Sequence, residues 1–324
     1  MNLRHFFIFL GLFVFNLPLQ AATLPGPLVD SVWLAKNMDT VVILDVRKDI
    51  KSFTAKPAYK RNKKTGKLKL VRVGGHISGA RLVNYKKVRS NREIDGKKVT
   101  RMLPTKADFE KLMQAAGMNK NSHVVIVSKG QSEGDVTIAT RLYWQLKYYG
   151  HTNIAILDGG VAQWIKDGNK VSTKPVKISK GNWVATAENK SILASSDDVA
   201  RAVKDKAVQI VDARVLSQYL GTYNKSYVYA KGHVPTAKTF PVELLTYPGG
   251  VARFTSAKDL ATLAKEFDID TKKPVITYCN SGHLASGAWF MMSEVMGNKQ
   301  AKLYDGSMHQ WTLEKRPTTV MKLE

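Results

Sequence analysis

Short apolar runs alternate along the chain with longer stretches of helical periodicity. The runs are rich in β-branched residues, which is typical of strands buried in a parallel sheet. Helical segments that separate such strands imply right-handed crossovers, so we expect α/β architecture with helices on both faces of each sheet. The expected strands are 41–44, 124–127, 154–157, 208–211, 275–278 and 301–304, and the expected helices are 106–116, 136–149, 196–203, 256–267 and 284–296.

The pattern occurs twice, because four landmarks of the first half recur in the same order in the second half. A repeat of this size indicates a tandem duplication of a whole domain rather than a solenoid. We therefore expect two tandem α/β domains, residues 23–172 and 194–324, joined by a linker at 173–193. The matched pairs are Val42–Arg47 with Gln209–Arg214, Gly75–Ala80 with Gly232–Ala237, Val124–Val127 with Pro274–Thr277, and Leu157–Trp164 with Tyr304–Trp311.

The first 22 residues predict export. Arg4 and His5 precede an apolar run, Phe6–Phe15, and the small residues Ala21 and Ala22 follow it. A short positive region, an apolar core and small residues together are typical of a secretory signal peptide. The run is too short to span a bilayer, which takes about 20 apolar residues. We expect residues 1–22 to be a signal peptide and the mature protein to be periplasmic. We expect no integral membrane segment in the mature chain.

The formal net charge of the chain is +24, and part of it gathers in the segment Lys48–Arg72. A basic segment can bind nucleic acid, attract an anionic membrane surface or steer small anionic substrates towards a site. An exported protein does not meet nucleic acid, so that class of partner is excluded. The alternative to a membrane-binding or substrate-steering role is that this segment is a solvated basic loop without a partner.

Cys279 is the only cysteine of the chain, so no internal disulfide can form. It directly follows the expected strand 275–278, and a helix is expected to start near Ala285. Ligands of open α/β sheets bind at the carboxyl ends of the strands. The helix N-terminus and the loop N–H groups favour the thiolate, which is the nucleophilic form. We expect Cys279 to be a catalytic nucleophile, with a buried structural thiol as the alternative, and the active-site loop to be Asn280, Ser281, Gly282, His283 and Leu284.

The motifs of both halves resemble those of the tandem-domain rhodanese family. They are the Asp-x-Arg after a strand, the Gly-His turn, the strand-Cys-loop-helix segment and the Asp-Gly-Gly/Ser ending before a tryptophan. The family includes thiosulfate and 3-mercaptopyruvate sulfurtransferases, so the resemblance implies two rhodanese-like domains of which only the second is catalytic. The first half agrees, since it has no cysteine in its loop Ser128–Asp135; Lys129 falls nearest to the position of the nucleophile.

The resemblance also implies a mechanism. Cys279 would take sulfane sulfur from a small anionic donor as a persulfide and pass it to cyanide or to a thiol, in two half-reactions. No cofactor is implied. No metal is expected either, because the histidines are scattered and form no zinc-type cluster.

The sequence departs from the family at the donor site. The segment Cys279–Leu284 matches neither the thiosulfate-type nor the mercaptopyruvate-type loop, although Ser281 and Gly282 are closer to the second. Gln218 stands where the family has an arginine that helps to bind substrate. Arg214 is present, but the resemblance implies that it mainly anchors structure, together with Asp212. The cation that binds the donor is therefore unassigned.

Other landmarks have simpler structural readings. We expect Asp45 and Asp212 to bond loop amides and the nearby Gly-His turns rather than to act as acids, and His76 and His233 to be hydrogen-bonded turn residues. His283 either stabilises the thiolate or donor, or points to solvent. We expect Trp164 and Trp311 to be core residues or interdomain anchors. The tyrosines of the segment Tyr219–Tyr229 either line the rim of the cleft or pack against the other domain.

Two other functions were weighed. Cysteine phosphatases of the same fold need an arginine six residues after the cysteine to clamp phosphate, and this chain has Ala285 there. A sulfur carrier or sensor that delivers its persulfide to an acceptor protein, without efficient turnover of small molecules, remains the alternative to an enzyme.

Overall fold

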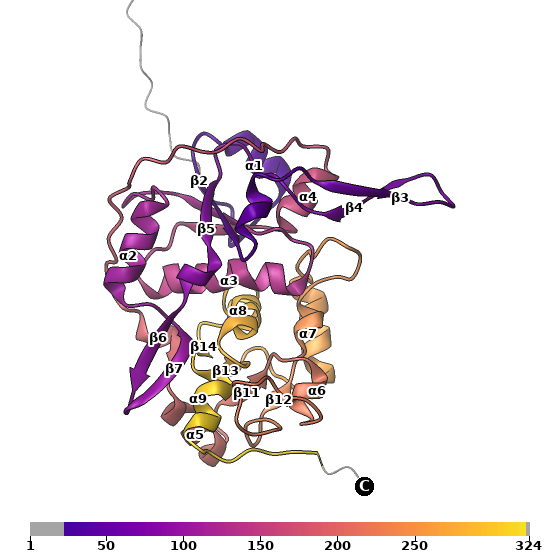
Figure 1. The fold of residues 1–324 in the computed structure, drawn as a ribbon. Helices are drawn as coiled ribbons and strands as arrows, with labels where there is room; N and C mark the ends of the chain where they lie inside the picture. The colour runs from indigo at the N-terminus through magenta and orange to yellow at the C-terminus, as the bar shows by residue number, and fades with distance from the viewer. Residues whose placement is uncertain (1–22, 322–324) are drawn as a thin grey trace, which may run out of the picture.

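Each half of the chain forms a five-stranded parallel sheet, and the two sheets share one strand order. The order is β1-β9-β8-β2-β5 in the first sheet and β10-β14-β13-β11-β12 in the second. The structure, a computed structural model, describes residues 23–321, and the predicted signal peptide at 1–22 lies outside them (Figure 1). The strands are Leu28–Val29 (β1), Val42–Arg47 (β2), Arg81–Asn84 (β5), Val124–Val127 (β8), Ile154–Leu157 (β9), Leu193–Ala194 (β10), Gln209–Asp212 (β11), Lys238–Thr239 (β12), Val275–Tyr278 (β13) and Ala301–Tyr304 (β14).

Helices cover both sheets, and several of them start at a polar cap. The side chains of Thr105, Ser132, Ser195 and Ser256 each accept a hydrogen bond from the backbone N–H three residues further on, which satisfies a donor that the first turn leaves free. No helix in the described part of the chain is long and apolar enough to cross a membrane. The α-helices are Ser31–Asn37 (α1), Lys106–Ala115 (α2), Glu133–Tyr148 (α3), Gly160–Lys166 (α4), Ser196–Asp205 (α5), Leu216–Tyr219 (α6), Ala257–Glu266 (α7), His283–Phe290 (α8) and Ser307–Leu313 (α9).

Shorter helical turns complete the two units. The turn η2 follows the edge strand β5, and η4 follows its counterpart β12, so these turns also repeat. The 3₁₀ turns are Ile50–Phe53 (η1), Tyr85–Val88 (η2), Lys190–Ile192 (η3) and Val242–Leu245 (η4), and the π-helix Met291–Val295 (η5) follows α8.

The predicted fold class, two tandem α/β domains with parallel sheets, is confirmed. The predicted helix bounds differ by one or two residues at α2, α5 and α7, and by more at the other two helices. Helix α3 starts at Glu133 instead of 136 because Ser132 caps it. The single helix predicted at 284–296 is divided: α8 starts at His283, ends at Phe290 and passes into the π-helix. His283 and Leu284 therefore lie in the first turn of α8 and not in the loop before it.

The segment between the two sheets has no regular structure over residues 173–189. It is not a free linker, since Trp183 is buried and its backbone N–H donates to the carbonyl of Met118 in the first unit. The tryptophans of the two Asp-Gly motifs, Trp164 and Trp311, lie in the cores of their own units and do not anchor the interface. Their indole N–H groups donate to nearby carbonyls.

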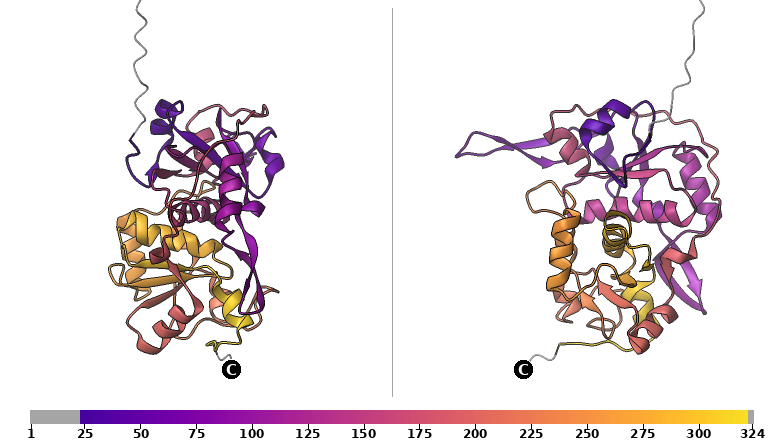
Figure 2. Two further views of the ribbon diagram at one scale, coloured as in Figure 1. Left: turned by 90° about the vertical axis from the view of Figure 1, so that its left-hand side faces the viewer. Right: turned by 180° about the vertical axis from the view of Figure 1, so that it is seen from behind.

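Two hairpins belong to the first unit alone. The hairpin of β3 (Ala58–Arg61) and β4 (Leu68–Arg72) carries most of the basic segment and extends away from the body of the molecule (Figure 2). The hairpin of β6 (Ser90–Ile94) and β7 (Lys97–Met102) runs instead along the second unit. There the backbone N–H of Thr100 donates to His309 Nε2 at 3.1 Å.

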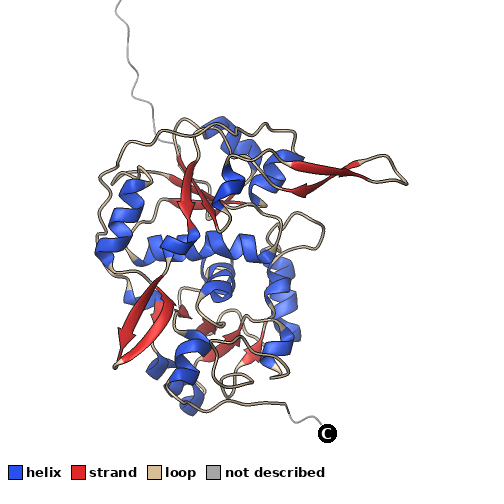
Figure 3. Cartoon of the chain, in the orientation of Figure 1, coloured by secondary structure: helices blue, strands red, loops and turns tan. Residues whose placement is uncertain are grey.

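The two units meet through helices α3 and α8, which pack together between the sheets (Figure 3). One apolar cluster runs through both units, from Leu44 of β2 to Trp289 of α8. Burial of one contiguous apolar core across two domains holds them in a fixed arrangement, since loosely joined domains share smaller and more polar interfaces.

Polar contacts at the interface repeat the symmetry of the two units. Asp158 follows β9 and accepts from the backbone N–H of Phe254 at 2.8 Å, while Asp305 follows β14 and accepts from that of Leu103 at 2.7 Å. Each aspartate also bonds an arginine of the opposite unit, Arg253 and Arg141 respectively. The arginine side chains differ in exposure: that of Arg253 is 57% exposed and that of Arg141 is 0% exposed.

The difference in burial predicts unequal effects of two matched substitutions. Asp305→Asn leaves the Arg141 charge buried without its counter-ion, so we expect a loss on the order of 3 kcal/mol of unfolding free energy. Asp158→Asn breaks an exposed pair and should cost about 1 kcal/mol or less. Chemical denaturation monitored by tryptophan fluorescence measures both, and equal losses would contradict the assignment of Asp305 as the main interdomain link.

Candidate active site

Cys279 lies at the carboxyl end of β13, directly before the helix α8. Cys279 is 1% exposed and belongs to the apolar cluster that the two units share. The turn into the helix requires glycine at position 282, which has φ +66°, and a Cβ there would lie 2.5 Å from atoms of Arg141 and Asp305. The loop that carries the sulfur is thus only four residues long, Cys279 to Gly282, and is closely packed against the interdomain ion pair.

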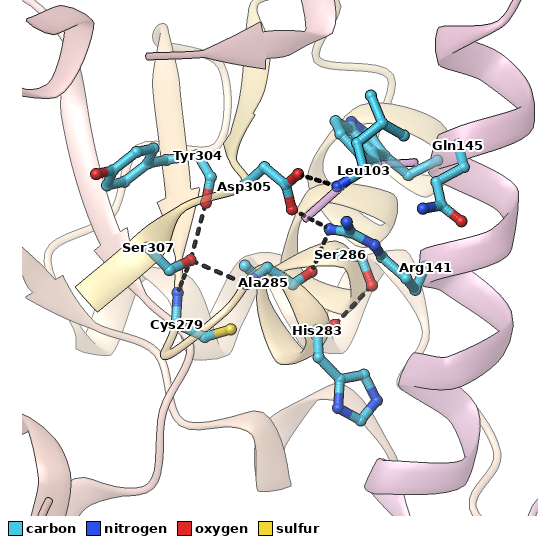
Figure 4. Close-up of polar contacts among 12 residues, drawn as sticks. Leu103, Arg141, Gln145, Cys279, His283, Ala285, Ser286, Tyr304, Asp305 and Ser307 are labelled. Carbon is cyan, nitrogen blue, oxygen red and sulfur yellow. Dashed lines mark hydrogen bonds and ion pairs between the residues drawn. The ribbon is translucent and has the colours of Figure 1, made fainter. Parts of the chain in front are cut away.

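The side chain of Ser307 fixes both ends of this loop. Its hydroxyl accepts hydrogen bonds from the backbone N–H groups of Cys279 and Gly282, at 3.1 and 3.0 Å, and donates to the carbonyl of Tyr304 (Figure 4). The residue adopts φ +51°, an uncommon value for a side chain other than glycine. Sequence reasoning missed Ser307, although a signal existed: it is the position where the first unit has Gly160 in the repeated Asp-Gly-Gly/Ser motif.

Arg141 fixes the loop from the other domain. Its Nη1 donates to Asp305 Oδ1 at 2.6 Å and to the carbonyl of Gly282 at 3.1 Å (Figure 4). A residue of the half without a cysteine thus positions the active-site loop of the other half. The sequence offers no signal for this contact, because Arg141 and Asp305 are 164 positions apart.

The remaining loop residues are buried rather than open to solvent. Asn280 is 6% and Ser281 is 4% exposed. The Asn280 amide donates to Oε1 of Gln218 at 2.8 Å. Gln218, the residue that replaces the family arginine, is therefore engaged in holding the loop. Leu284 packs against the shared apolar core from the first turn of α8.

Asp212 and Arg214 form a buried pair that joins three segments of the second unit. The guanidinium contacts both carboxylate oxygens of Asp212 and donates to the carbonyl of Gly232, while the hydroxyl of Tyr278 donates to Asp212 at 2.8 Å. Burial alone would lower the pKa of Arg214, but the charge and hydrogen bonds of Asp212 raise it above its usual value. Asp212 accepts a hydrogen bond from the backbone N–H of Arg214 at 3.0 Å, as predicted, but Arg214 and not the carboxylate reaches the Gly-His turn.

The first unit repeats this arrangement with Asp45 and Arg47. Arg47 contacts both oxygens of Asp45 at 2.7 Å and donates to the carbonyl of Gly75. The histidines of the two Gly-His turns, His76 and His233, bond backbone carbonyls through Nδ1, as expected of turn residues. The aspartate, arginine and histidine of each unit therefore make matching contacts and do not distinguish the unit that carries the cysteine.

The prediction that Lys129 matches the nucleophile is wrong by one residue. The backbone N–H of Met308 donates to the carbonyl of Cys279, and the equivalent N–H of Val161 donates to the carbonyl of Ser128. Ser128 therefore occupies the position of Cys279 in the first unit. The misplacement arose because the strand Val124–Val127 was matched with Pro274–Thr277, whereas its counterpart is Val275–Tyr278: Val127 pairs with Asp45 as Tyr278 pairs with Asp212.

His283 does not point to solvent. Its Nε2 lies 3.0 Å from the hydroxyl of Thr137 on α3, and its ring lies 5.2 Å from that of Tyr85, both in the first domain. In Figure 4 the imidazole projects away from the Cys279 side chain. Burial, with the nearby charges of Lys48 and other cations, holds the pKa of His283 well below its usual range, so the ring is neutral at pH 7.

The four tyrosines of the segment Tyr219–Tyr229 divide between the two expected roles. Tyr227 packs against the first domain, where the guanidinium of Arg101 lies 3.8 Å from its ring centroid. Tyr219 stacks on His233 within its own unit. Tyr223 and Tyr229 are 48% and 60% exposed.

Within residues 23–321 no group of three or more His, Cys, Asp or Glu side chains is placed to hold a metal ion.

Comparisons with known proteins agree with this geometry. A model of the rhodanese-like domain matches the chain twice, at residues 30–167 and 195–314, and the chain belongs to the rhodanese family. It is 28% identical over 224 residues to the thiosulfate sulfurtransferase of Bos taurus (67% of this chain, 72% of that protein). It is also 26% identical over 298 residues to the sulfur carrier protein TtuD of Thermus thermophilus (89% and 94%).

The fold is shared with solved structures. The 3-mercaptopyruvate sulfotransferase SseA of Escherichia coli superposes with a TM-score of 0.69 at 23% identity, covering 87% of this chain and 98% of SseA. Two sheets with a common strand order and one interdomain core are thus the architecture of a tandem rhodanese.

The depressed pKa of His283 predicts a pH dependence of stability. The unfolded chain binds a proton at His283 below about pH 6.5, whereas the folded chain does not, so stability falls as the pH falls below that value, by up to about 1.4 kcal/mol per pH unit. His283→Gln should remove this contribution. Urea unfolding of both proteins between about pH 7.5 and 5.5 tests it, and equal losses in the two proteins would show that the buried imidazole does not cause them.

Proposed function

We propose that this protein is a sulfurtransferase that moves sulfane sulfur from a small anionic donor, of the thiosulfate or mercaptopyruvate type, to cyanide or a thiol through a persulfide on Cys279. The observation that carries the proposal is the placement of the lone cysteine: it ends a buried parallel strand and precedes the N-terminus of α8, in a unit of the rhodanese family. Relatives named thiosulfate sulfurtransferase support the reaction class.

The first half-reaction is a displacement at sulfur. With thiosulfate, the Cys279 thiolate attacks the outer sulfur, an S–S bond forms to Cys279, and the S–S bond of thiosulfate breaks with its electron pair leaving on sulfite. The terminal sulfur of the resulting persulfide keeps the negative charge. The free N–H groups of the first turn of α8 and the helix dipole favour that anion. Ser307 and Arg141 keep the loop in the geometry that presents them.

In the second half-reaction the acceptor removes the terminal sulfur. Cyanide attacks it, thiocyanate leaves, and the electron pair of the broken bond returns to Cys279 as a thiolate. A thiol acceptor is converted into its own persulfide in the same way. Donor and acceptor use one site in turn, which predicts ping-pong kinetics.

A sulfur carrier that hands its persulfide to a partner protein is the second candidate. The similarity to the carrier TtuD favours it, and so does the position of Gln218, which bonds Asn280 where the family has a substrate-binding arginine. Turnover separates the two candidates. An enzyme releases many thiocyanate molecules per chain with excess thiosulfate and cyanide, whereas a carrier loads one sulfur atom per chain and turns over poorly.

Cys279→Ser tests the role of the thiol. We expect intact-protein mass spectrometry of the reduced wild type to show the gain of one sulfur atom after thiosulfate or mercaptopyruvate, and its removal by cyanide. The variant should show no gain while it unfolds at nearly the same temperature, because serine is isosteric and the site is small. Sulfur loading that persists in the variant would overturn the proposal.

We also propose that the protein acts in the periplasm after removal of residues 1–22. Expression of the full chain in a Gram-negative host should give a mature protein in the periplasmic fraction, with an N-terminus near Thr23 by N-terminal sequencing. The apolar run Phe6–Phe15 and the alanines before the cleavage zone support this. An uncleaved chain that stays in the cytoplasmic fraction would contradict it.

A further inference from the structure

Tyr85 of the first domain forms the centre of a cationic cluster beside the active-site loop. Its side chain is fully buried, and its hydroxyl has no hydrogen-bond partner among the described residues. The guanidinium carbon of Arg89 lies 4.4 Å from its ring centroid, and Nζ of Lys48 lies 5.6 Å from it. The ring of His283 lies 5.2 Å away on the side of the second domain. The first domain thus presents two cations to the start of α8.

Within residues 23–321, neither Lys48 nor Arg89 forms an ion pair with a carboxylate, and Nε of Arg89 is buried without a partner. Burial first, and then the charge of Arg89, lower the pKa of Lys48; the carboxylate of Asp135 on α3 opposes them, and Lys225 lowers the pKa by a smaller amount. The pKa of Arg89 is also lowered, by burial and by other arginines. Positive groups held close together without a direct ion pair favour the binding of an anion.

The cluster lies within electrostatic reach of the sulfur. Burial raises the pKa of Tyr85 to about 12, and a negative charge on Cys279 is one of the smaller influences in the same direction. The cations Lys48 and Arg89 both act on His283, four positions after the cysteine. Because the ring of His283 in the first turn of α8 lies 5.2 Å from that of Tyr85, an anion held at this cluster lies beside the helix that follows the cysteine loop.

The duplication shows that these cations are not part of the common framework. Lys48 follows the Asp-x-Arg arginine of the first unit, and the equivalent position in the second unit is Val215. Arg89 follows the turn η2 directly, and the residue that follows the equivalent turn η4 is Thr246. Each unit faces the other across the interface, so cations occur on the face opposite Cys279, whereas their counterparts opposite Ser128 are neutral.

We propose that the first domain supplies the donor-binding cations that the second domain lacks, an inference that rests on the proposed sulfurtransferase function. Lys48 and Arg89 bind the oxyanion end of the donor, a sulfonate-like or carboxylate group, and leave its outer sulfur towards Cys279. Lys225, an exposed lysine of the second domain, adds positive charge from the opposite side. The first domain, which has no thiol, would then contribute donor-binding residues to the active site.

Anion binding can be measured without sulfur transfer. Thiosulfate is titrated calorimetrically into the full-length Cys279→Ser protein, alone and combined with Lys48→Gln, with Arg89→Gln or with both. We expect each substitution to weaken binding on the order of ten-fold, the effect of losing a hydrogen bond to a charged group. Lys63→Gln, which removes the same charge from the exposed β3–β4 hairpin, should leave the affinity unchanged. Equal affinities in all variants, or no binding by Cys279→Ser itself, would overturn the assignment.

Kinetics separate a donor-binding role from a structural one. In proteins that keep Cys279, Lys48→Gln and Arg89→Gln should raise the thiosulfate concentration needed for half-maximal sulfur loading, again on the order of ten-fold. Discharge of the preloaded persulfide by dithiothreitol, an uncharged thiol, should not change. Arg89→Lys, which keeps the charge, should recover part of the loss. Loading and discharge that fall together would show that the residues only maintain the fold, and would overturn the inference.

The two proposals fail in different ways. If wild-type Cys279 gains no sulfur from any donor, the proposed function is wrong whatever the calorimetry shows. If the wild type loads normally and the Lys48 and Arg89 variants load as the wild type does, the proposed function stands and the cation assignment is wrong. Salt gives a further check, since screening should slow loading of the wild type more than that of the doubly substituted protein.

Discussion

The contact between Arg141 and Asp305 is the interaction on which the rest of the active site depends. It lies fully inside the interface, and the same guanidinium nitrogen bonds the carbonyl of Gly282. A buried charge must keep its partner, because desolvation without it costs several kcal/mol. The relative position of the two domains and the shape of the cysteine loop are therefore determined together. A domain movement that opened the interface would also break the bond from Arg141 to Gly282, so the cysteine loop would lose its support when the sulfur became accessible.

The repeated architecture makes the functional positions visible as departures from symmetry. Strand order and the buried Asp-x-Arg pairs occur in both units and serve both equally. Ser128 opposite Cys279 and Gly160 opposite Ser307 differ between them. A thiol and the hydroxyl that organises its loop amides were thus placed in one unit only. Since an ordinary structural role would serve both units, the differences mark chemistry better than the similarities do.

How far the sequence could predict this structure depended on the range of the interactions involved. Strands such as 124–127 and 275–278 were located to the residue, because a short β-branched run between helical segments depends only on its own composition. Cys279 was recognised by the same local pattern of strand, loop and helix. His283 and Gln218 could not be assigned, since their partners Thr137 and Asn280 lie 146 and 62 positions away. Side-chain contacts between domains follow from packing, which a single sequence does not display.

The burial of Cys279 bears on the choice between enzyme and carrier. A residue that is 1% exposed is shielded from chance oxidation and from pairing with other chains. The same shielding restricts the reactants that reach the sulfur. A protein acceptor would have to insert a narrow segment there or separate the domains against the buried link between Arg141 and Asp305. Sulfur transfer to a protein partner would therefore carry the cost of breaking this buried link.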